Sequence, residues 1–157
     1  MIDTERLILR AFAPEDLDAY VEIMSSPAVY RYLGNGQGQT RDQIEHWMNQ
    51  WNGTFGHGMG VYAVVERESG KLIGHCGLRG LICGRKEILY AIAESAWGKG
   101  YATEAMRAVL DAHDFRPLMA VSYPENTASM GVMKKLGFKH IGQEVMFGTT
   151  LESYILE

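Results

Sequence analysis

The sequence has few cysteines and no long apolar run. Its two cysteines, Cys76 and Cys83, could pair with each other but are too few for a disulfide framework. The low count, with no pattern typical of a secretory signal, leads us to expect a cytoplasmic protein. No apolar stretch reaches the roughly 20 residues that a membrane-spanning helix needs, so we expect no membrane partner.

The sequence also lacks the spacings of a metal site and the charge of a nucleic-acid-binding protein. Its five histidines are scattered, with no pair four residues apart and no Cys-x-x-Cys motif, so we expect no metal. There are 19 acidic and 15 basic residues, for a net charge of −4, and this balance argues against binding of nucleic acid through phosphate contacts. A mildly acidic surface tolerates or attracts cationic amines, although the same charge also serves solubility alone.

The length of 157 residues and the hydrophobic content of 46% predict one domain over residues 1–157. Apolar periodicity predicts the element order β-α-α-β-β-β-α-β-α-β-β. Strands are expected at 6–12, 61–67, 71–78, 87–92, 118–123, 138–147 and 150–156, and helices at 14–24, 41–51, 102–110 and 127–136. The strand, helix and strand over 87–123 imply a parallel pair inside a mostly antiparallel sheet of about seven strands.

The most informative segment is 97–102, Trp-Gly-Lys-Gly-Tyr-Ala, between a predicted strand and a predicted helix. Glycines 98 and 100 allow a sharp turn and let a ligand approach the backbone directly. The amides of the turn and of the first helical turn have no intrahelical partner, and the helix dipole adds partial positive charge there. The segment therefore predicts a turn that binds a pyrophosphate group.

Two other glycine-rich loops, 34–38 and 53–60, flank the second predicted helix. Neither lies between a strand and a helix, so neither has the context of a phosphate-binding loop. We interpret both as mobile loops at the rim of a binding site.

Four stretches of the chain resemble a known family: Thr-Glu-Arg-Leu-Ile-Leu-Arg at 4–10, Pro-Glu-Asp at 14–16, Trp-Gly-Lys-Gly-Tyr-Ala-Thr-Glu-Ala at 97–105, and 124–138, from Pro-Glu-Asn-Thr-Ala-Ser to Lys-Leu-Gly-Phe. Through them the chain resembles the GCN5-related N-acetyltransferase (GNAT) superfamily. Within it, the chain is most similar to the branch of ribosomal-protein N-terminal alanine acetyltransferases and many small-amine acetyltransferases. The resemblance covers nearly the whole chain and implies a GNAT-like mixed α/β fold, with helices on both faces of the sheet and one splayed parallel strand pair.

The resemblance implies acetyl-coenzyme A as the co-substrate. In the superfamily pattern Gln/Arg-x-x-Gly-x-Gly/Ala, Trp97 stands at the first position, as is common in this branch, and Gly100 and Ala102 stand at the glycine positions. Residues expected to hold the pyrophosphate are Gly98, Lys99, Gly100, Tyr101, Ala102 and Thr103. The strand edge with Tyr90, Ile92 and Ala93 is expected to pair with the pantetheine amides like an added strand. Asn126 is expected to touch the pantetheine arm and also to cap the next helix.

The implied reaction is direct transfer of an acetyl group to a primary amine, on a protein N-terminus or on a small molecule. Many members carry a tyrosine acid where this chain has Met133, which cannot donate a proton. Ser129, one helical turn earlier, is the candidate acid, and a purely hydrogen-bonding role is the alternative. Glu87 is the candidate base, with His75 or an ordered water as alternatives. An acyl-enzyme on Cys76 has no adjacent base to support it.

A different class of function is a non-catalytic protein that binds or senses acyl-coenzyme A on the same fold. The absence of tyrosine at position 133 leaves this alternative open. We expect loops 34–38 and 53–60 and the closing hairpin at 138–156 to determine the amine acceptor. The sequence names neither the acceptor nor the oligomeric state, for which a homodimer is one alternative.

Overall fold

A computed structural model describes residues 1–55, 59–81 and 83–157. Its centre is an eight-stranded sheet in the order β1-β2-β3-β4-β5-β6-β8-β7. The strands are β1 (Ile2–Asp3), β2 (Leu7–Arg10), β3 (Gly60–Glu66), β4 (Leu72–Gly80), β5 (Lys86–Ile92), β6 (Leu118–Ser122), β7 (Lys139–Met146) and β8 (Thr149–Leu156). Of the strand pairs, β5 with β6 is parallel and the others are antiparallel.

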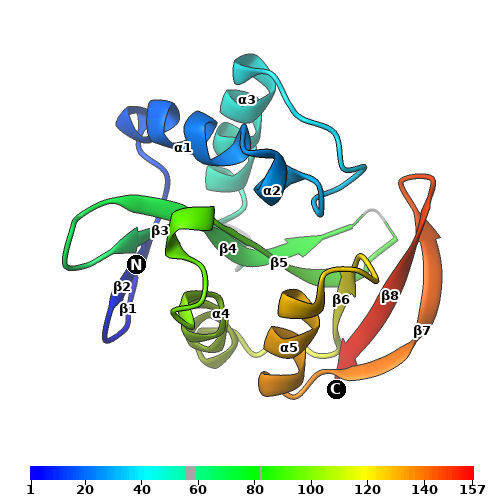
Figure 1. The fold of residues 1–157 in the computed structure, drawn as a ribbon. Coiled ribbons are helices and arrows are strands. Elements are labelled where there is room, and N and C mark those ends of the chain that lie inside the picture. Colours follow the sequence, from blue (N-terminus) through cyan, green and yellow to red (C-terminus); the bar gives the residue numbers. More distant parts are fainter. Residues whose placement is uncertain (56–58, 82) are drawn as a thin grey trace.

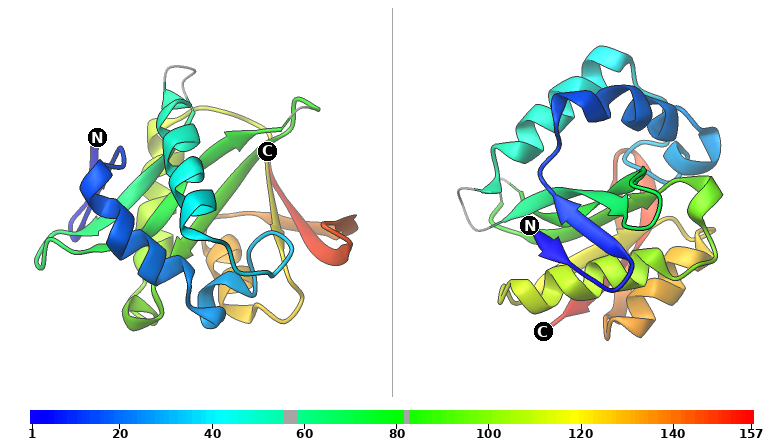
Figure 2. Two further views of the ribbon diagram at one scale, coloured as in Figure 1. Left: turned by 90° about the horizontal axis from the view of Figure 1, so that it is seen from above. Right: turned by 90° about the vertical axis from the view of Figure 1, so that its left-hand side faces the viewer.

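Helices cover both faces of this sheet (Figures 1 and 2). One face carries α1 (Leu17–Met24), α2 (Pro27–Tyr30) and α3 (Arg41–Asn52), and the other carries α4 (Tyr101–Ala112) and α5 (Thr127–Lys135). Two short 3₁₀ turns, Pro14–Asp16 and Glu94–Ala96, precede α1 and α4. The predicted mixed α/β architecture, with helices on both faces and one parallel pair, is confirmed.

Local sequence signals explain where the second long helix begins. The hydroxyl of Thr40 accepts a hydrogen bond from the Gln43 amide at 3.2 Å, and the Gln43 side chain accepts one from the Thr40 amide at 2.9 Å. This reciprocal capping box satisfies two of the amides that a helix N-terminus leaves without partners. The first long helix, α1, ends at Met24 as predicted, and Pro27 begins the short helix α2, which was not predicted. Proline fits there because the first helical position needs no amide donor.

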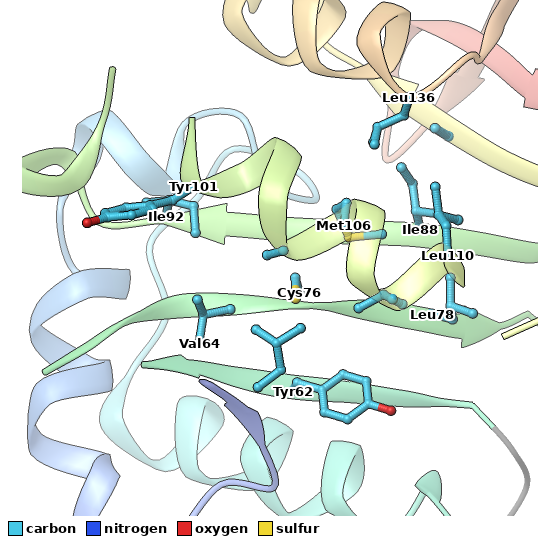
Figure 3. Packing of buried hydrophobic residues seen from close by; sticks show 14 of the residues in the cluster. Tyr62, Val64, Cys76, Leu78, Ile88, Ile92, Tyr101, Met106, Leu110 and Leu136 are labelled. Carbon is cyan, nitrogen blue, oxygen red and sulfur yellow. The ribbon is translucent and has the colours of Figure 1, made fainter. Parts of the chain in front are cut away.

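The core consists of two layers, one on each side of the sheet. Between the sheet and helices α4 and α5 lie side chains such as Val64, Leu78, Ile88 and Met106 (Figure 3). The opposite layer, between the sheet and helices α1 to α3, contains Tyr20, Ile44, Met48, Trp51 and Val61 among others. Met106 is fully buried, so its replacement by alanine would cost about 2–5 kcal/mol of stability.

Several boundaries differ from the prediction. The two-residue strand β1 has no sequence pattern long enough to reveal it, and it raises the strand number from about seven to eight.

Both cysteines are free: Cys76 is buried and Cys83 is exposed. In the described residues, no helix has the length and apolar character to cross a membrane. Across 1–55, 59–81 and 83–157, no three His, Cys, Asp or Glu side chains converge as metal ligands would.

Candidate active site

The neighbouring parallel strands β5 and β6 pair over a short length and then diverge. Their only registered pair is Glu87 with Met119. On its other edge β5 stays bonded to β4, and the Ala93 amide donates to the Ile73 carbonyl at 2.7 Å. Because hydrogen bonding alternates along an antiparallel strand, the backbone amides of Tyr90 and Ile92 face the gap toward β6. The splay therefore offers an unpaired strand edge inside the molecule.

A turn of two left-handed glycines connects the end of this strand to α4. Gly98 and Gly100 have φ values of 76° and 79°, which side-chain-bearing residues rarely adopt. An added Cβ would meet nothing within 4 Å at Gly98, and at Gly100 only Arg6 Nη2 at 3.7 Å. The predicted turn is confirmed, and the space beside it is open to a ligand.

The first amides of α4, at 101–103, donate no hydrogen bond to any described backbone or side-chain acceptor, as expected at a helix N-terminus. Cations lie close to this end of the helix. The Arg6 guanidinium is 4.5 Å and the Lys99 ammonium 5.9 Å from the centre of the Tyr101 ring. Unpaired amides, a helix dipole and nearby cations together suit a phosphate-bearing ligand.

A pocket of about 510 Å³ leads from the glycine turn along the end of β5 to α5. All of the predicted cofactor-binding residues except Ala93 and Lys99 line it: Tyr90, Ile92, Gly98, Gly100, Tyr101, Ala102, Thr103 and Asn126. Sequence reasoning missed Arg31 and Lys135, which add two cations to its wall. A single basic residue just after a short helix or in a last helical turn forms no distinctive pattern, so the sequence did not indicate either residue.

A second pocket, of about 320 Å³, lies next to the first. Its lining contains seven aromatic side chains: Tyr30, Tyr32, Trp47, Trp51, Tyr90, Tyr123 and Phe147. Loop 34–38 and the closing hairpin contribute to this wall, whereas the described part of 53–60 does not, and residues 56–58 lie outside the described residues. The Tyr123 hydroxyl donates to the Gly34 carbonyl at 2.7 Å and so ties loop 34–38 to the end of β6.

The two pockets meet at Tyr90 and Ser129, which line both. The Tyr90 phenolic oxygen lies 2.6 Å from Ser129 Oγ. Asn126 also lines both pockets, and its side-chain oxygen accepts from the Ser129 amide at 3.3 Å, which caps α5. The cap fixes the first turn of α5 and thereby the position of Ser129 at the junction.

Comparison with known proteins decides the family. The model of the acetyltransferase (GNAT) domain family matches residues 6–139. The chain belongs to the GNAT acetyltransferase family. It is 31% identical over 150 residues to "Uncharacterized N-acetyltransferase p20" of Bacillus licheniformis, a match that covers 88% of this chain and 82% of p20.

Solved structures of GNAT proteins share the fold over almost the whole chain. A GNAT-family acetyltransferase from Bacillus anthracis superimposes with a TM-score of 0.84 at 25% identity, covering 99% of this chain and 96% of that one. RimL, a ribosomal L7/L12 α-N-protein acetyltransferase solved with coenzyme A, has a TM-score of 0.81 at 18% identity, covering 98% of this chain and 94% of that one. At that identity RimL supports the fold alone, and the family match supports acyl transfer as the general chemistry.

Glu87, the predicted base of this GNAT protein, lies in the wall of the second pocket. It is only 1% exposed. Its Oε1 is 2.9 Å from Arg85 Nε, and its Oε2 is 3.3 Å from Arg79 Nη2. Arg85 in turn binds Glu144 through two hydrogen bonds, of 2.6 and 2.9 Å. Glu87 therefore reaches the pocket as part of a charge cluster rather than as an isolated carboxylate.

His75 is buried but lines the second pocket, whereas Cys76 lies in the core. Burial lowers the pKa of His75 to about 3, and the charge of Arg79 contributes to the shift. The Nδ1 atom of His75 is hydrogen-bonded to the Tyr20 hydroxyl at 2.6 Å. Burial raises the pKa of the Cys76 thiol, and this residue lines neither pocket. The geometry thus favours structural roles for both residues.

Proposed function

We propose that this protein is an N-acetyltransferase that moves an acetyl group from acetyl-coenzyme A directly to a primary amine. One observation carries the proposal: a pocket that leads from the glycine turn along the end of β5 to α5 meets an aromatic-walled pocket at Ser129 and Tyr90. Two substrates that enter from the two pockets would meet at those side chains. Holding both substrates together is itself a large part of catalysis.

The first pocket supports binding of acetyl-coenzyme A. The residues at 98–103 would hold its pyrophosphate through free backbone amides, and Arg6, Arg31 and Lys135 would balance its negative charge. The unpaired edge of β5 would bond the pantetheine amides as a neighbouring strand does. When bound, acetyl-coenzyme A supplies the thioester whose acetyl group is transferred.

Ser129 is the proposed general acid. Its hydroxyl lies at the junction of the pockets, whereas Met133, one turn later, is buried and has no proton to give. The Tyr90 amide faces the same gap from β5 and is the proposed donor to the oxyanion that forms when the amine attacks. Backbone donors of this kind stabilise charge that develops only in the transition state.

Glu87 is the proposed base, because it is the one carboxylate among the described residues that line the second pocket. The nitrogen of the amine loses its proton readily once the bond to carbon has begun to form. A carboxylate that also contacts Arg79 and Arg85 is therefore a sufficient acceptor, directly or through a water. The low pKa of His75, about 3, makes it the weaker candidate.

The second pocket supports an acceptor with one amine and an apolar body. Among the described residues that line it, the one Asp, Glu, Lys or Arg besides Glu87 is Arg79, and these two already contact each other. A second ammonium group on the acceptor would lose water there without gaining a free carboxylate. An aromatic wall instead favours an apolar or aromatic side chain, on a small amine or on the first residue of a peptide.

The test is acetyl-coenzyme A turnover over a panel of amines, read as free thiol and confirmed by the mass of the product. The panel holds arylalkylamines, alkylamines, peptides with different first residues, spermidine and an aminoglycoside. We expect turnover, with kcat/KM highest for a monoamine that carries an apolar group. Acetyl-coenzyme A binding without turnover on any amine would favour the non-catalytic alternative, which the methionine at position 133 supports. An absence of binding would contradict both.

A further inference from the structure

We propose that Tyr90 relays a proton through Ser129 to the departing sulfur, so that the two hydroxyls act as one acid. This inference rests on the proposed acetyl transfer and assigns a role to a side chain that the reaction would otherwise leave unused. Its basis is the 2.6 Å contact between the two hydroxyl oxygens at the place where the two pockets meet.

The geometry leaves two arrangements of the hydroxyl protons. In one, Ser129 donates to the Tyr90 oxygen, and Tyr90 donates to the Ser129 carbonyl at 3.3 Å. In the other, Tyr90 donates to Ser129 Oγ, and the serine proton is free to point into the cleft. The second arrangement has the shorter bond from Tyr90 and presents a proton to a ligand. It is the one that can act as an acid.

The surroundings keep Tyr90 protonated until the reaction. Burial raises the pKa of its phenol to about 12, and the hydrogen bond to Ser129 offsets part of that rise. A phenol is nevertheless a far stronger acid than the alcohol of serine. Passing the negative charge on to Tyr90 therefore costs less than leaving it on Ser129 Oγ, which is the physical reason for a relay.

The proton count balances without any further reactant except water. As the carbon–sulfur bond breaks, Ser129 gives its proton to the sulfur and Tyr90 gives its proton to Ser129. The proton lost by the amine goes to Glu87 and then to solvent. Solvent returns one proton to the phenolate of Tyr90, which also borders the second pocket. The net transfer is one proton from amine to thiol.

The test compares Tyr90→Phe, Ser129→Ala and the double variant with Tyr154→Phe as the matched control. Tyr154 lies close enough to affect the pKa of Tyr90, but its hydroxyl has no hydrogen-bond partner among the described residues. Single-turnover rates are measured with acetyl-coenzyme A and the best amine in mixtures of H₂O and D₂O. The dependence of the rate on the D₂O fraction gives the number of protons that move in the transition state. We expect Tyr90→Phe to lower the rate on the order of tenfold with little change in KM for acetyl-coenzyme A.

The relay predicts that one proton fewer moves in the transition state of Tyr90→Phe than in that of the wild type. It also predicts that the double variant has a rate no lower than that of Ser129→Ala. Tyr154→Phe should match the wild type. An unchanged proton count in Tyr90→Phe would overturn the relay. So would a wild-type rate in Tyr90→Phe if Ser129→Ala is slow. In both cases the proposed acetyl transfer would still stand. If Tyr90→Phe fails to fold, a wild-type proton inventory that shows a single proton overturns the relay by itself.

Discussion

The indole nitrogen of Trp97 donates a hydrogen bond to the backbone carbonyl of Ile92 at 2.6 Å. This bond joins the last residue of β5 to the glycine turn, even though Trp97 is 46% exposed. It therefore fixes the proposed phosphate-binding turn relative to the strand edge that would hold the pantetheine arm. The family pattern has Gln or Arg at this position, and here the indole performs a bridging role that its exposure would not suggest.

Removing this bond should weaken acetyl-coenzyme A binding more than it weakens the fold. We expect Trp97→Phe to raise the Kd about fivefold, since a net hydrogen bond contributes about 1 kcal/mol. Isothermal titration calorimetry measures the effect, with Trp47→Phe as control because Trp47 lines only the second pocket. Equal Kd values for wild type and Trp97→Phe would show that the bond does not position the turn.

The glycine turn should tolerate no side chain at position 100. In Gly100→Val we expect a folded protein with acetyl-coenzyme A affinity reduced at least tenfold, because a β-branched side chain would occupy the ligand's approach. The matched control is Gly70→Val, which has a similar φ of 71° and equally open surroundings in the β3–β4 hairpin. Both variants should lose stability, on the order of 1–2 kcal/mol. Loss of affinity in both, or in neither, would contradict the assignment of the site.

Replacing the proposed base, Glu87, should change the pH dependence of the rate. Glu87→Gln keeps the volume and removes the charge, so turnover should fall most at the acidic end, where fewer amines deprotonate unaided. Glu144→Gln is the control, because it takes a carboxylate from the same arginine cluster but does not line the pocket. A Glu87→Gln pH–rate profile that superimposes on that of Glu144→Gln would exclude Glu87 as the base.

Buried His75 should make stability depend on pH in a defined window. Its pKa is about 3 in the folded protein and 6.5 in the reference state. Below about pH 6.5 the unfolded chain therefore binds a proton at His75 that the folded chain does not bind. The free energy of unfolding falls as the pH falls. Urea unfolding at about pH 7.5 and about pH 5 should show His75→Gln losing about 1–2 kcal/mol less than the wild type over that interval. Equal losses would mean that His75 protonates without cost in the folded state.

Much of the fold could be predicted because strong local signals agree with the tertiary structure. The start of the helix at Arg41, the glycines at 98 and 100, and the Asn126 cap all appear where the sequence indicated them. These features depend on residues within one turn of each other, which a linear pattern records. The two-residue strand β1 depends instead on pairing with β2, and the short helix α2 on contacts with α1, so their sequences alone carried little information.

The candidate site was predictable only in part, for a related reason. The glycine turn is local, but the junction brings Tyr90 and Ser129 together across 39 residues of sequence. The charge cluster around Glu87 likewise joins β4, the β4–β5 turn and β7. Contacts of this kind arise from the sheet order, so the sequence identified the separate residues but not the partners that define their chemistry.

The most direct test of the account is a crystal structure with coenzyme A bound. The account predicts the pyrophosphate on the amides at 101–103, the pantetheine arm along the free edge of β5, and the sulfur within hydrogen-bonding distance of Ser129 Oγ. A pyrophosphate bound away from the glycine turn, or a thiol that ends outside the Tyr90–Ser129 junction, would contradict it.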